Sequence, residues 1–568
     1  MNIKRFFPNT AGIFALALVV RLVVLSRFGH SAYFSPTGGD MKFYAEWGQR
    51  LAGGQGMDAR AFYGLPGYPF LLGGIFTLFG FSPYAVAFLQ TLGEAASAAL
   101  IYWIATWAFP GSRPRLVGTL AALGWMFYQP AQALSLIVMP TAWAVLAFWG
   151  AFAWSVQTES RSRWWPWAPL GVLIGLASTL VATVLVVLPI PVAAAVRNLR
   201  KPGAILAAMA CLLAGVAAGT SPCWYHNYFI AGEPVLLSAH SGLNFWIGNN
   251  PDANGYPKIP AGLRASQEGL MEDSVRIAEA DAGRSLSRAE VSRFWSSKAN
   301  AYILNNPRQW MGLMAVKVRN FWNAAQYDDL SIINPLMEEG VLTPGLRFGW
   351  IAVLGISGLA LAWRRVPRSR WIAAGVLLSM VALLPVFVTE RYRLVAAPGL
   401  LLLGAYGIAE MGQMLASRCW SGAGTWLASG VAAFFIVHLP QNTPELGWLD
   451  AFNNGRNALQ TGNLVVAHSQ LERALALAPQ NADILSALGS CCLREHNWSN
   501  ARNYYEQALQ INPQTVSALN NLAILEMMDS HWAKAQALLN TALQVEPNDP
   551  KIRELAVRCI HKLSQQAP

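Results

Sequence analysis

Long apolar runs separated by short polar segments dominate the first 440 residues of the chain. A helix needs about 20 apolar residues to cross a bilayer core. Runs of this kind predict about eleven spans, near residues 11–28, 84–108, 115–132, 137–156, 165–178, 180–196, 203–220, 346–363, 371–388, 394–412 and 424–439. The stretch 165–196 fits either two short helices or one long helix. Residues 67–80 are apolar but short, so we expect them to lie flat at the membrane interface.

Basic residues between these runs predict how the spans are oriented. Lys and Arg gather in alternate loops, at Lys4, Arg5, Arg113, Arg115, Arg161, Arg163, Arg197, Arg200, Lys201, Arg364, Arg365, Arg368, Arg370 and Arg418. The positive-inside rule assigns these loops and the amino terminus to the cytoplasm. The external side then holds the loops 29–83 and 221–345 and everything after residue 440. We therefore expect an all-α, polytopic transmembrane bundle over 1–440 in the cytoplasmic (inner) membrane, with a mixed periplasmic loop region.

A 34-residue period marks the chain after residue 440. Ala467, Ala501 and Ala535 recur at this spacing, as do Ala474, Ala508 and Ala542, and also Pro479, Pro513 and Pro547. Small residues where two helices touch, with Pro closing each unit, are typical of tetratricopeptide repeats. We expect residues 441–568 to form an external (periplasmic) α-solenoid with units near 448–481, 482–515 and 516–549. Its groove docks a protein or peptide partner, or the repeats act as a scaffold or self-association module; the pattern favours neither.

Composition narrows the class of protein. Hydrophobic residues make up 54% of the chain and charged residues 12%. The charged fraction is about half the roughly 25% of a soluble protein, which excludes a soluble enzyme and intrinsic disorder. Basic cytoplasmic loops explain the net charge of +11, so we expect no nucleic-acid partner. The six cysteines show neither metal-ligand spacing nor a disulfide framework, and the sequence contains no phosphate-cradling glycine loop, metalloprotease His pair or nucleophile elbow.

Polar residues near the predicted external face carry the candidate chemistry. Asp40 follows two glycines, and it either acts as a general base in an apolar site or caps the helix that follows. Arg391 and Arg393 flank Tyr392 at the outer end of two spans, where they either hold a phosphate or anchor the chain at the interface. Residues 249–252 read Asn-Asn-Pro-Asp, a sequence typical of a turn. Asparagine side chains also hydrogen-bond sugars.

Taken in order, these motifs resemble the membrane glycosyltransferases of the GT-C superfamily, and more narrowly bacterial relatives of dolichyl-phosphate-mannose–protein mannosyltransferases and aminoarabinose transferases. The resemblance covers about residues 1–440. It rests on Asp40…Tyr44, Tyr63-Gly64-Leu65-Pro66-Gly67-Tyr68-Pro69, Gly248-Asn249-Asn250-Pro251, Lys317 in Val316-Lys317-Val318-Arg319-Asn320-Phe321-Trp322, and Arg391-Tyr392-Arg393-Leu394. Joining such a domain to external repeats is similar to the transmembrane and tetratricopeptide O-mannosyltransferases that modify extracytoplasmic proteins.

The resemblance implies an inverting glycosyltransferase that moves a sugar from a polyprenyl-phosphate donor to an acceptor hydroxyl, with protein O-glycosylation as one interpretation. It makes Asp40 the general base, and it makes Arg391, Arg393 and Lys317 the residues that bind the donor phosphate. By position, the substrate-binding candidates are Tyr44, Tyr68, Asn249, Asn250 and His226. The implied partners are the lipid-linked sugar, a protein or glycan acceptor and the lipid bilayer. No cofactor is indicated with certainty: no metal ligand is identified, and a divalent metal is left open.

The chain departs from the family's pattern at three positions. Many relatives have Glu where this chain has Met41, an acidic residue near Pro140, and Arg where this chain has His226. These departures leave the acceptor class, the metal requirement and activity itself open. The alternative function is a non-catalytic membrane scaffold that recruits envelope or polysaccharide assembly partners through its repeats. A transporter is disfavoured because the spans hold few ionisable residues, chiefly Arg21 and Glu94.

Overall fold

The computed structural model describes residues 10–29, 31, 33–36, 39–157, 164–199, 201–260, 262–263, 267–440, 444–460, 462–545 and 549–566. Over these ranges the chain forms helices and no strand, apart from one isolated bridge between Tyr128 and Leu346. The expected all-α class is therefore confirmed. Of the residues used in the sequence patterns, Lys4, Arg5, Gly38, Arg161, Arg163, Arg200 and Pro547 lie outside the described residues.

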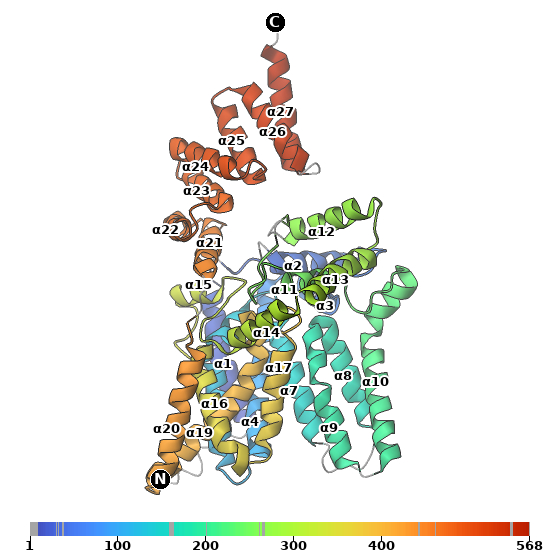
Figure 1. The fold of residues 1–568 in the computed structure, drawn as a ribbon, viewed down its shortest axis with the longest axis vertical. Helices are drawn as coiled ribbons and strands as arrows, with labels where there is room; N and C mark the ends of the chain where they lie inside the picture. The colour runs from blue at the N-terminus through green and yellow to red at the C-terminus, as the bar shows by residue number, and fades with distance from the viewer. Residues whose placement is uncertain are drawn as a thin grey trace. The chain divides into compact units, whose positions relative to one another are not determined.

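The chain separates into two compact units. The first comprises Met1–Asp329 and Leu336–Leu439, and the second comprises Leu330–Pro335 and Pro440–Pro568. The helices of the first unit (Figure 1) are α1 Thr10–Phe28, α2 Gly39–Ala52, α3 Gly67–Phe79, α4 Pro83–Ala108, α5 Pro114–Met126, α6 Gln129–Leu136, α7 Thr141–Gln157, α8 Trp167–Leu180, η3 Ala182–Val187, α9 Pro189–Asn198, α10 Pro202–Tyr225, η4 His226–Ile230, α11 Ser241–Gly248, α12 Gln267–Ala282, α13 Arg288–Asn305, α14 Pro307–Trp322, α16 Phe348–Arg365, α17 Ser369–Val381, α18 Glu390–Arg393, η5 Leu394–Ala396, α19 Ala397–Ala416 and α20 Trp420–Val437. Helix α15, Ile333–Glu338, crosses the boundary between the two units.

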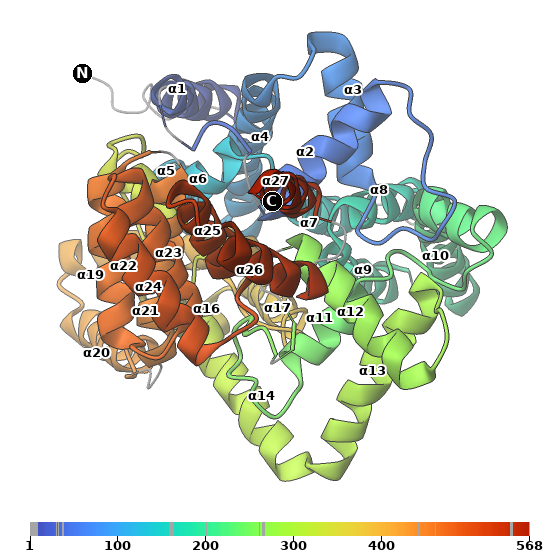
Figure 2. The same ribbon diagram turned by 90° about the horizontal axis from the view of Figure 1, so that it is seen from above.

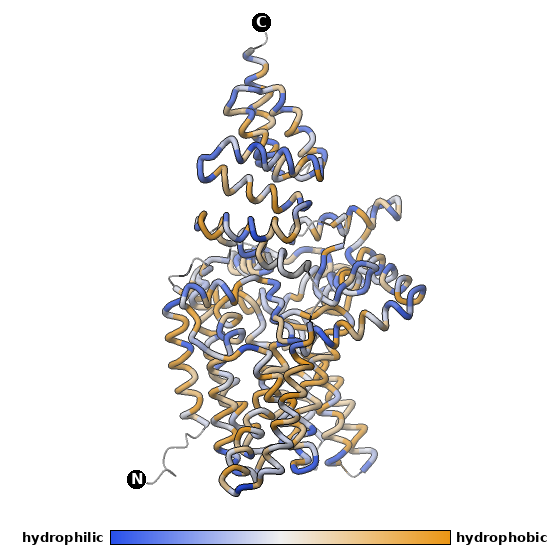
Figure 3. The backbone as a smooth tube through the Cα atoms, turned by 60° about the vertical axis from the view of Figure 1, so that its left-hand side comes forward, coloured by the Kyte–Doolittle hydropathy of each residue, from blue (hydrophilic) through white to orange (hydrophobic). Residues whose placement is uncertain are grey.

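Five helices in the described part of the chain are long and apolar enough to cross a membrane, which fits a multi-pass membrane protein. They are Thr10–Phe28, Pro83–Ala108, Pro202–Ile230, Glu390–Ala416 and Trp420–Val437. The bent pair α6 and α7, with an angle of 118° between them, would add a sixth. The predicted count of about eleven is thus not confirmed, because other predicted spans form shorter apolar helices such as α8 and α17. The stretch 165–196 forms short helices that break at Val181, not one long helix. Figure 3 shows hydrophobic residues concentrated along the bundle.

Glycines explain the close contact between α8 and α10. A side chain at Gly171 or Gly175 of α8 would lie 2.2 or 2.5 Å from a backbone oxygen of α10. A side chain at Gly215 or Gly219 of α10 would lie 2.2 or 2.4 Å from a backbone oxygen of α8. This reciprocal small-xxx-small arrangement lets two apolar helices pack backbone to backbone, which is how transmembrane helices gain van der Waals contact without a hydrophobic driving force.

The two ionisable residues noted in the spans pair with each other. Arg21 of α1 donates from Nη2 to Glu94 Oε2 of α4 at 3.1 Å, and both side chains are buried. The same nitrogen lies 3.2 Å from the Trp125 carbonyl oxygen. A charge inside an apolar bundle is stable only with a partner, so this ion pair joins α1 to α4.

Helices α11 to α14 lie beyond one end of the long helices of the first unit (Figure 1), and α13 and α14 diverge from their junction (Figure 2). Leu243 of α11, Leu270 of α12 and Trp295 of α13 share a core with Phe387, which precedes α18. The folded part of the long loop 221–345 therefore packs against the segment that leads into Arg391.

The second unit is a solenoid of paired helices. These are α21 Pro444–Gln460, α22 Leu464–Leu477, α23 Ala482–Arg494, α24 Trp498–Ile511, α25 Val516–Met528, α26 Trp532–Val545 and α27 Pro550–Gln566. All six alanines of the 34-residue period, Ala467, Ala474, Ala501, Ala508, Ala535 and Ala542, are fully buried between helices. Small residues at these contacts are what the repeat pattern required, and the predicted tetratricopeptide solenoid is confirmed.

Candidate functional site

Arg391 links two carboxylates that are far apart in the sequence. Its Nη1 donates to Asp40 Oδ2 at 2.6 Å, and its Nε lies 2.8 Å from Asp329 Oδ2. The side chains of Arg391 and Asp329 are nearly buried, whereas that of Asp40 is 27% exposed. We name Asp40, Asp329 and Arg391 the acidic clamp. Asp40 is the member that solvent or a ligand reaches most easily.

Three segments converge to build the acidic clamp. Asp40 lies in the first turn of α2, directly after Gly39, whose φ of +57° is the left-handed conformation that glycine adopts readily. Arg391 lies in α18, whose N-cap Thr389 accepts from the Tyr392 amide. The Glu390 amide donates to the Tyr327 carbonyl at 2.8 Å, which brings the chain near Asp329 alongside α18.

Aromatic residues surround Asp40. Tyr44 of α2 packs edge-on against Tyr68 at 5.3 Å between ring centroids, and the Tyr68 hydroxyl donates to Gln90. Burial, and then the charge of Asp40, raise the pKa of Tyr44 and of Tyr63 above their ordinary value, so both phenols keep their protons. Each therefore remains a potential hydrogen-bond donor beside the Asp40 carboxylate.

His240 lies against Tyr63, with 4.8 Å between the ring centroids. Burial lowers the pKa of His240 to about 4, although the charge of Asp40 opposes this effect, so the imidazole is neutral at pH 7. Within the described residues, His240 Nδ1 and the Tyr63 hydroxyl are buried without a hydrogen-bond partner. Buried polar atoms of this kind usually have a partner, so they mark a position where a polar ligand would be favoured.

Arg393 has a different environment from Arg391. Its guanidinium is buried, pairs with Glu390 at 2.5 Å, and donates to the carbonyls of Asn323 at 2.8 Å and Ala325 at 3.1 Å. The group also lies 3.8 Å from the Phe348 ring centroid. The structure therefore does not bring Arg393 into the acidic clamp, and its donors already serve the packing of the chain.

Lys317 and Asn249 form a second polar pair. Lys317 Nζ donates to Asn249 Oδ1 at 3.2 Å and to the Leu384 carbonyl at 2.8 Å, and Asn249 donates to the Pro385 carbonyl at 2.6 Å. Lys317 is fully buried, and burial lowers its pKa to about 7. An ammonium among neutral partners is an unusual group to bury, and an anionic ligand would stabilise its charged form.

The remaining predicted site residues have structural contacts. Asn250 donates to the Trp246 and Ile247 carbonyls and accepts from the Asp252 amide, which fixes the predicted turn. The His226 ring stacks on Phe62 at 4.2 Å and contacts the Arg60 carbonyl. His226 thus supports the segment that carries Tyr63.

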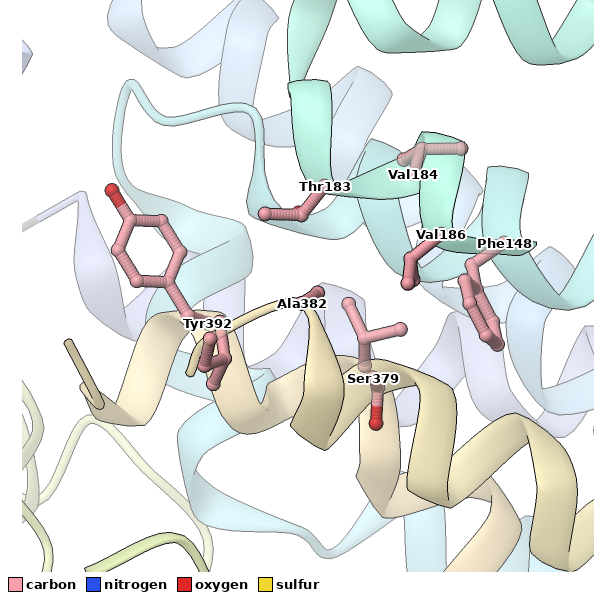
Figure 4. A pocket seen from close by; sticks show the side chains of 9 residues that line it. Phe148, Thr183, Val184, Val186, Ser379, Ala382 and Tyr392 are labelled. Atoms are coloured by element: carbon pink, nitrogen blue, oxygen red, sulfur yellow. The ribbon is translucent and has the colours of Figure 1, made fainter. Parts of the chain in front are cut away.

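Two hollows are lined by neighbours of the acidic clamp, Tyr392 in one and Tyr63 with His240 in the other. A narrow crevice of about 10 Å³ lies between α7, η3 and α17 and is lined mainly by apolar side chains, together with Thr183, Ser379 and Tyr392. Figure 4 shows Tyr392, the neighbour of Arg391, at one end of this crevice and Phe148 at the other. A larger cavity of about 480 Å³ has a mixed polar and apolar lining that includes Tyr63, His240, Arg60, Arg288, Glu279 and Trp295.

Sequence reasoning did not identify Asp329, Tyr63 or His240 as members of this site. Asp329 ends the acidic pair Asp328-Asp329 in the predicted external loop, and that pair was the available signal. His240 carries no such signal, since a lone histidine in a loop is not distinctive. Both carboxylates of the clamp already contact the Arg391 guanidinium, so this donor set does not fit a divalent cation in the arrangement observed.

Comparisons with known proteins identify the repeats. Two tetratricopeptide repeat family models match residues 452–515 and 493–559. Comparison with curated protein sequences finds no match. Similar solved structures include the Archaeoglobus fulgidus oligosaccharyltransferase in its apo form, at 12% identity and TM-score 0.39, covering 89% of this chain and 60% of that one. The same enzyme tethered to an acceptor peptide aligns at 11% identity and TM-score 0.37, over 82% and 59% of the two chains. The chain thus spans about 60% of those structures' length, and likeness at these scores carries no argument about activity.

Proposed function

We propose that this protein is a membrane glycosyltransferase that moves a sugar from a polyprenyl-phosphate donor to an acceptor hydroxyl at the external face of the cytoplasmic membrane. The observation that carries the proposal is the 2.6 Å contact between Asp40 and Arg391. The reaction needs a base for the acceptor and a cation for the departing phosphate, and these two residues supply both once their contact opens to admit the reacting sugar carbon.

The reaction is a single displacement. The acceptor oxygen attacks the anomeric carbon, the bond from that carbon to the phosphate oxygen breaks, and the acceptor proton passes to Asp40. The lipid phosphate gains a negative charge as it leaves. A guanidinium that binds it bidentately is stabilising where that charge develops. Inversion at the anomeric carbon follows because no covalent enzyme intermediate forms.

Arg391 can exchange its partner when the donor binds. A donor phosphate that draws the guanidinium toward itself would open the contact with Asp40, so that the carboxylate is free to face the acceptor hydroxyl only when donor is bound. Asp329 keeps Arg391 near the site during this exchange, since it contacts a different nitrogen of the guanidinium.

The larger hollow fits one substrate. It carries Tyr63 and His240 and suits a hydroxylated acceptor, whereas the crevice beside Tyr392 would have to widen to admit the first isoprene unit of the lipid. Buried Lys317 becomes a second cation when an anionic headgroup stabilises its charged form against burial, which lowers its pKa to about 7. The basic loops predicted to be cytoplasmic support an external site and an external repeat domain.

Transfer of label from a polyprenyl-phosphate sugar to acceptors in isolated membranes tests the proposal. Asp40→Asn keeps the shape of the side chain but removes the base, and we expect a loss of about 10²- to 10⁴-fold. Glu46→Gln is the matched control, because Glu46 lies on the same helix, is exposed and pairs with Lys42 of that helix. Transfer by the Asp40→Asn variant at the rate of the control would falsify the assignment.

A second candidate function rests on the repeats. The family-model matches over 452–559 favour protein recognition, which suits either docking of a protein acceptor or a non-catalytic scaffold. Deletion of 441–568 separates these possibilities. Docking predicts that modification of proteins is lost while transfer to small acceptors is kept; a scaffold predicts no transfer before or after deletion.

A further inference from the structure

Three side chains with metal-binding atoms meet in the first repeats. His468 lies on α22, Cys491 lies on α23, and Glu495 directly follows α23. His468 Nδ1 lies 3.3 Å from Glu495 Oε1, and Cys491 Sγ lies 3.7 Å from the same oxygen. All three ligand atoms lie within 4.8 Å of one another. In a tetrahedral zinc site, ligand atoms are roughly 3.3–3.8 Å apart, so only a small adjustment would close the group around an ion.

A fourth residue, Glu472, contacts the other ring nitrogen of His468. Glu472 Oε1 lies 3.3 Å from His468 Nε2, the ring nitrogen that faces away from Cys491 and Glu495. Histidines that bind metals usually donate their other ring N–H to a carboxylate, which fixes the tautomer and raises the basicity of the binding nitrogen. The group therefore has both kinds of contact that a metal site requires: three possible ligands (His468, Cys491 and Glu495) and a carboxylate, Glu472, that orients the histidine.

Exposure provides a path for an ion. Cys491 is fully buried, whereas His468 and Glu495 are each about 30% exposed, so the group opens to solvent on one side. Without a metal the thiol stays protonated, because burial, with a contribution from Glu495, raises the pKa of Cys491 to about 12. The thiol has one proton, which it donates weakly to either Glu495 or the Leu464 carbonyl.

We propose that His468, Cys491 and Glu495 bind one zinc ion, with Glu472 orienting His468 and water as the fourth ligand. Zinc is the best match because the ligands are one nitrogen, one sulfur and one oxygen, a mixture that hard cations such as Mg²⁺ and Ca²⁺ do not favour. Binding releases the Cys491 proton to solvent. The ion joins α22 to α23, so it stabilises the boundary between the first and second repeats.

The test uses the full chain in detergent after treatment with a chelator. Zn²⁺ is titrated against a chromophoric competitor, and Co²⁺ in a parallel sample reports thiolate ligation by its charge-transfer absorption. We expect one site per chain in the wild type, with its loss in Cys491→Ser and in His468→Ala. Glu472→Gln changes a partly exposed side chain and should weaken affinity by about 10- to 100-fold.

Cys492→Ser is the matched control, because Cys492 is the adjacent buried thiol but belongs to the core with Tyr505 and Leu522. It should keep wild-type affinity and the cobalt band. Circular dichroism establishes that each variant is folded. The proposal is overturned if the wild type binds no zinc, if Cys491→Ser binds as tightly as the wild type, or if Glu472→Gln leaves affinity unchanged.

Discussion

Arg391 and Asp40, 351 positions apart in the sequence, are joined by a contact of 2.6 Å. Arg391 also lies 2.8 Å from Asp329, so one guanidinium faces two carboxylates in a largely buried site. Two anions around one cation leave a net negative charge. A phosphate that binds there must displace one carboxylate, and Asp40 is the more exposed of the two. The contact is therefore an exchangeable pairing in the proposed reaction cycle.

Arg391→Lys tests the role of the guanidinium. Lysine keeps the charge but loses the planar fork that binds phosphate bidentately. Hydrogen bonds to charged groups contribute roughly 1.5–3 kcal/mol, so we expect the KM for the lipid-linked donor to rise about 10- to 100-fold. The KM for the acceptor should change little. Steady-state transfer at varied donor and acceptor concentrations measures both, and an unchanged donor KM would contradict the role.

Arg393→Met should affect stability before it affects donor binding. The substitution leaves Glu390 buried without its cation and the Asn323 and Ala325 carbonyls without a donor. Breaking a buried ion pair typically costs about 3–5 kcal/mol. We expect a large fall in thermal stability in detergent, measured by intrinsic fluorescence, while Arg391→Lys changes it little. A stable Arg393→Met protein with a weakened donor KM would instead return Arg393 to the phosphate site.

Lys317→Met should stabilise the protein in a pH-dependent way. The pKa of Lys317 is about 7 in the folded chain, against an ordinary value of 10.5. Folding therefore releases a proton between these values, and the folding cost of the buried lysine grows as the pH falls toward 7 and is constant below it. We expect the gain from Lys317→Met to be largest near pH 6 and to shrink toward pH 10. The gain in the free energy of unfolding is on the order of 1.4 kcal/mol for each pH unit by which burial lowers the pKa of Lys317.

Thermal unfolding at several pH values measures this gain, and Lys298→Met is the control because Lys298 is an exposed lysine of α13. An equal gain at every pH would show that Lys317 does not have a lowered pKa. Loss of donor binding in the stabilised Lys317→Met protein would support a functional reason for keeping a buried ammonium.

Gly175→Leu should separate α8 from α10. A Cβ at Gly175 already lies 2.5 Å from the Val216 carbonyl oxygen, so any larger side chain forces the backbones apart. Overpacking of this kind costs roughly 1–3 kcal/mol. Gly150→Leu in α7 is the control, since nothing lies within 4 Å of its Cβ position. Thermal unfolding of both variants in detergent measures the difference, and equal stability would contradict the backbone contact.

The repeats and the helical class were predictable because their signals are local or periodic. Ala467, Ala501 and Ala535 recur at a fixed spacing, and their burial follows from that spacing. The number of spans was not predictable in the same way. Apolar composition does not separate a helix that crosses a bilayer from a shorter one such as α3 or α8 inside a bundle.

The candidate site was only partly predictable, because tertiary contacts decide between equivalent side chains. Arg391 and Arg393 are two residues apart and look alike in sequence, yet one faces Asp40 and the other pairs with Glu390. Residues Asp329 and His240 reach the site through the packing of the loop 221–345, which no local pattern encodes. The Asp40 and Arg391 roles stay predictions, and the contacts of Arg393 give it a packing role.

The most direct test is a cryo-electron microscopy structure of the protein with a polyprenyl-phosphate bound. We predict phosphate density within hydrogen-bond distance of the Arg391 guanidinium, with the lipid chain entering the crevice beside Tyr392. The contact between Arg391 and Asp40 should lengthen beyond the 2.6 Å of the present structure. A phosphate bound elsewhere, with the Arg391–Asp40 contact unchanged, would contradict the proposed site.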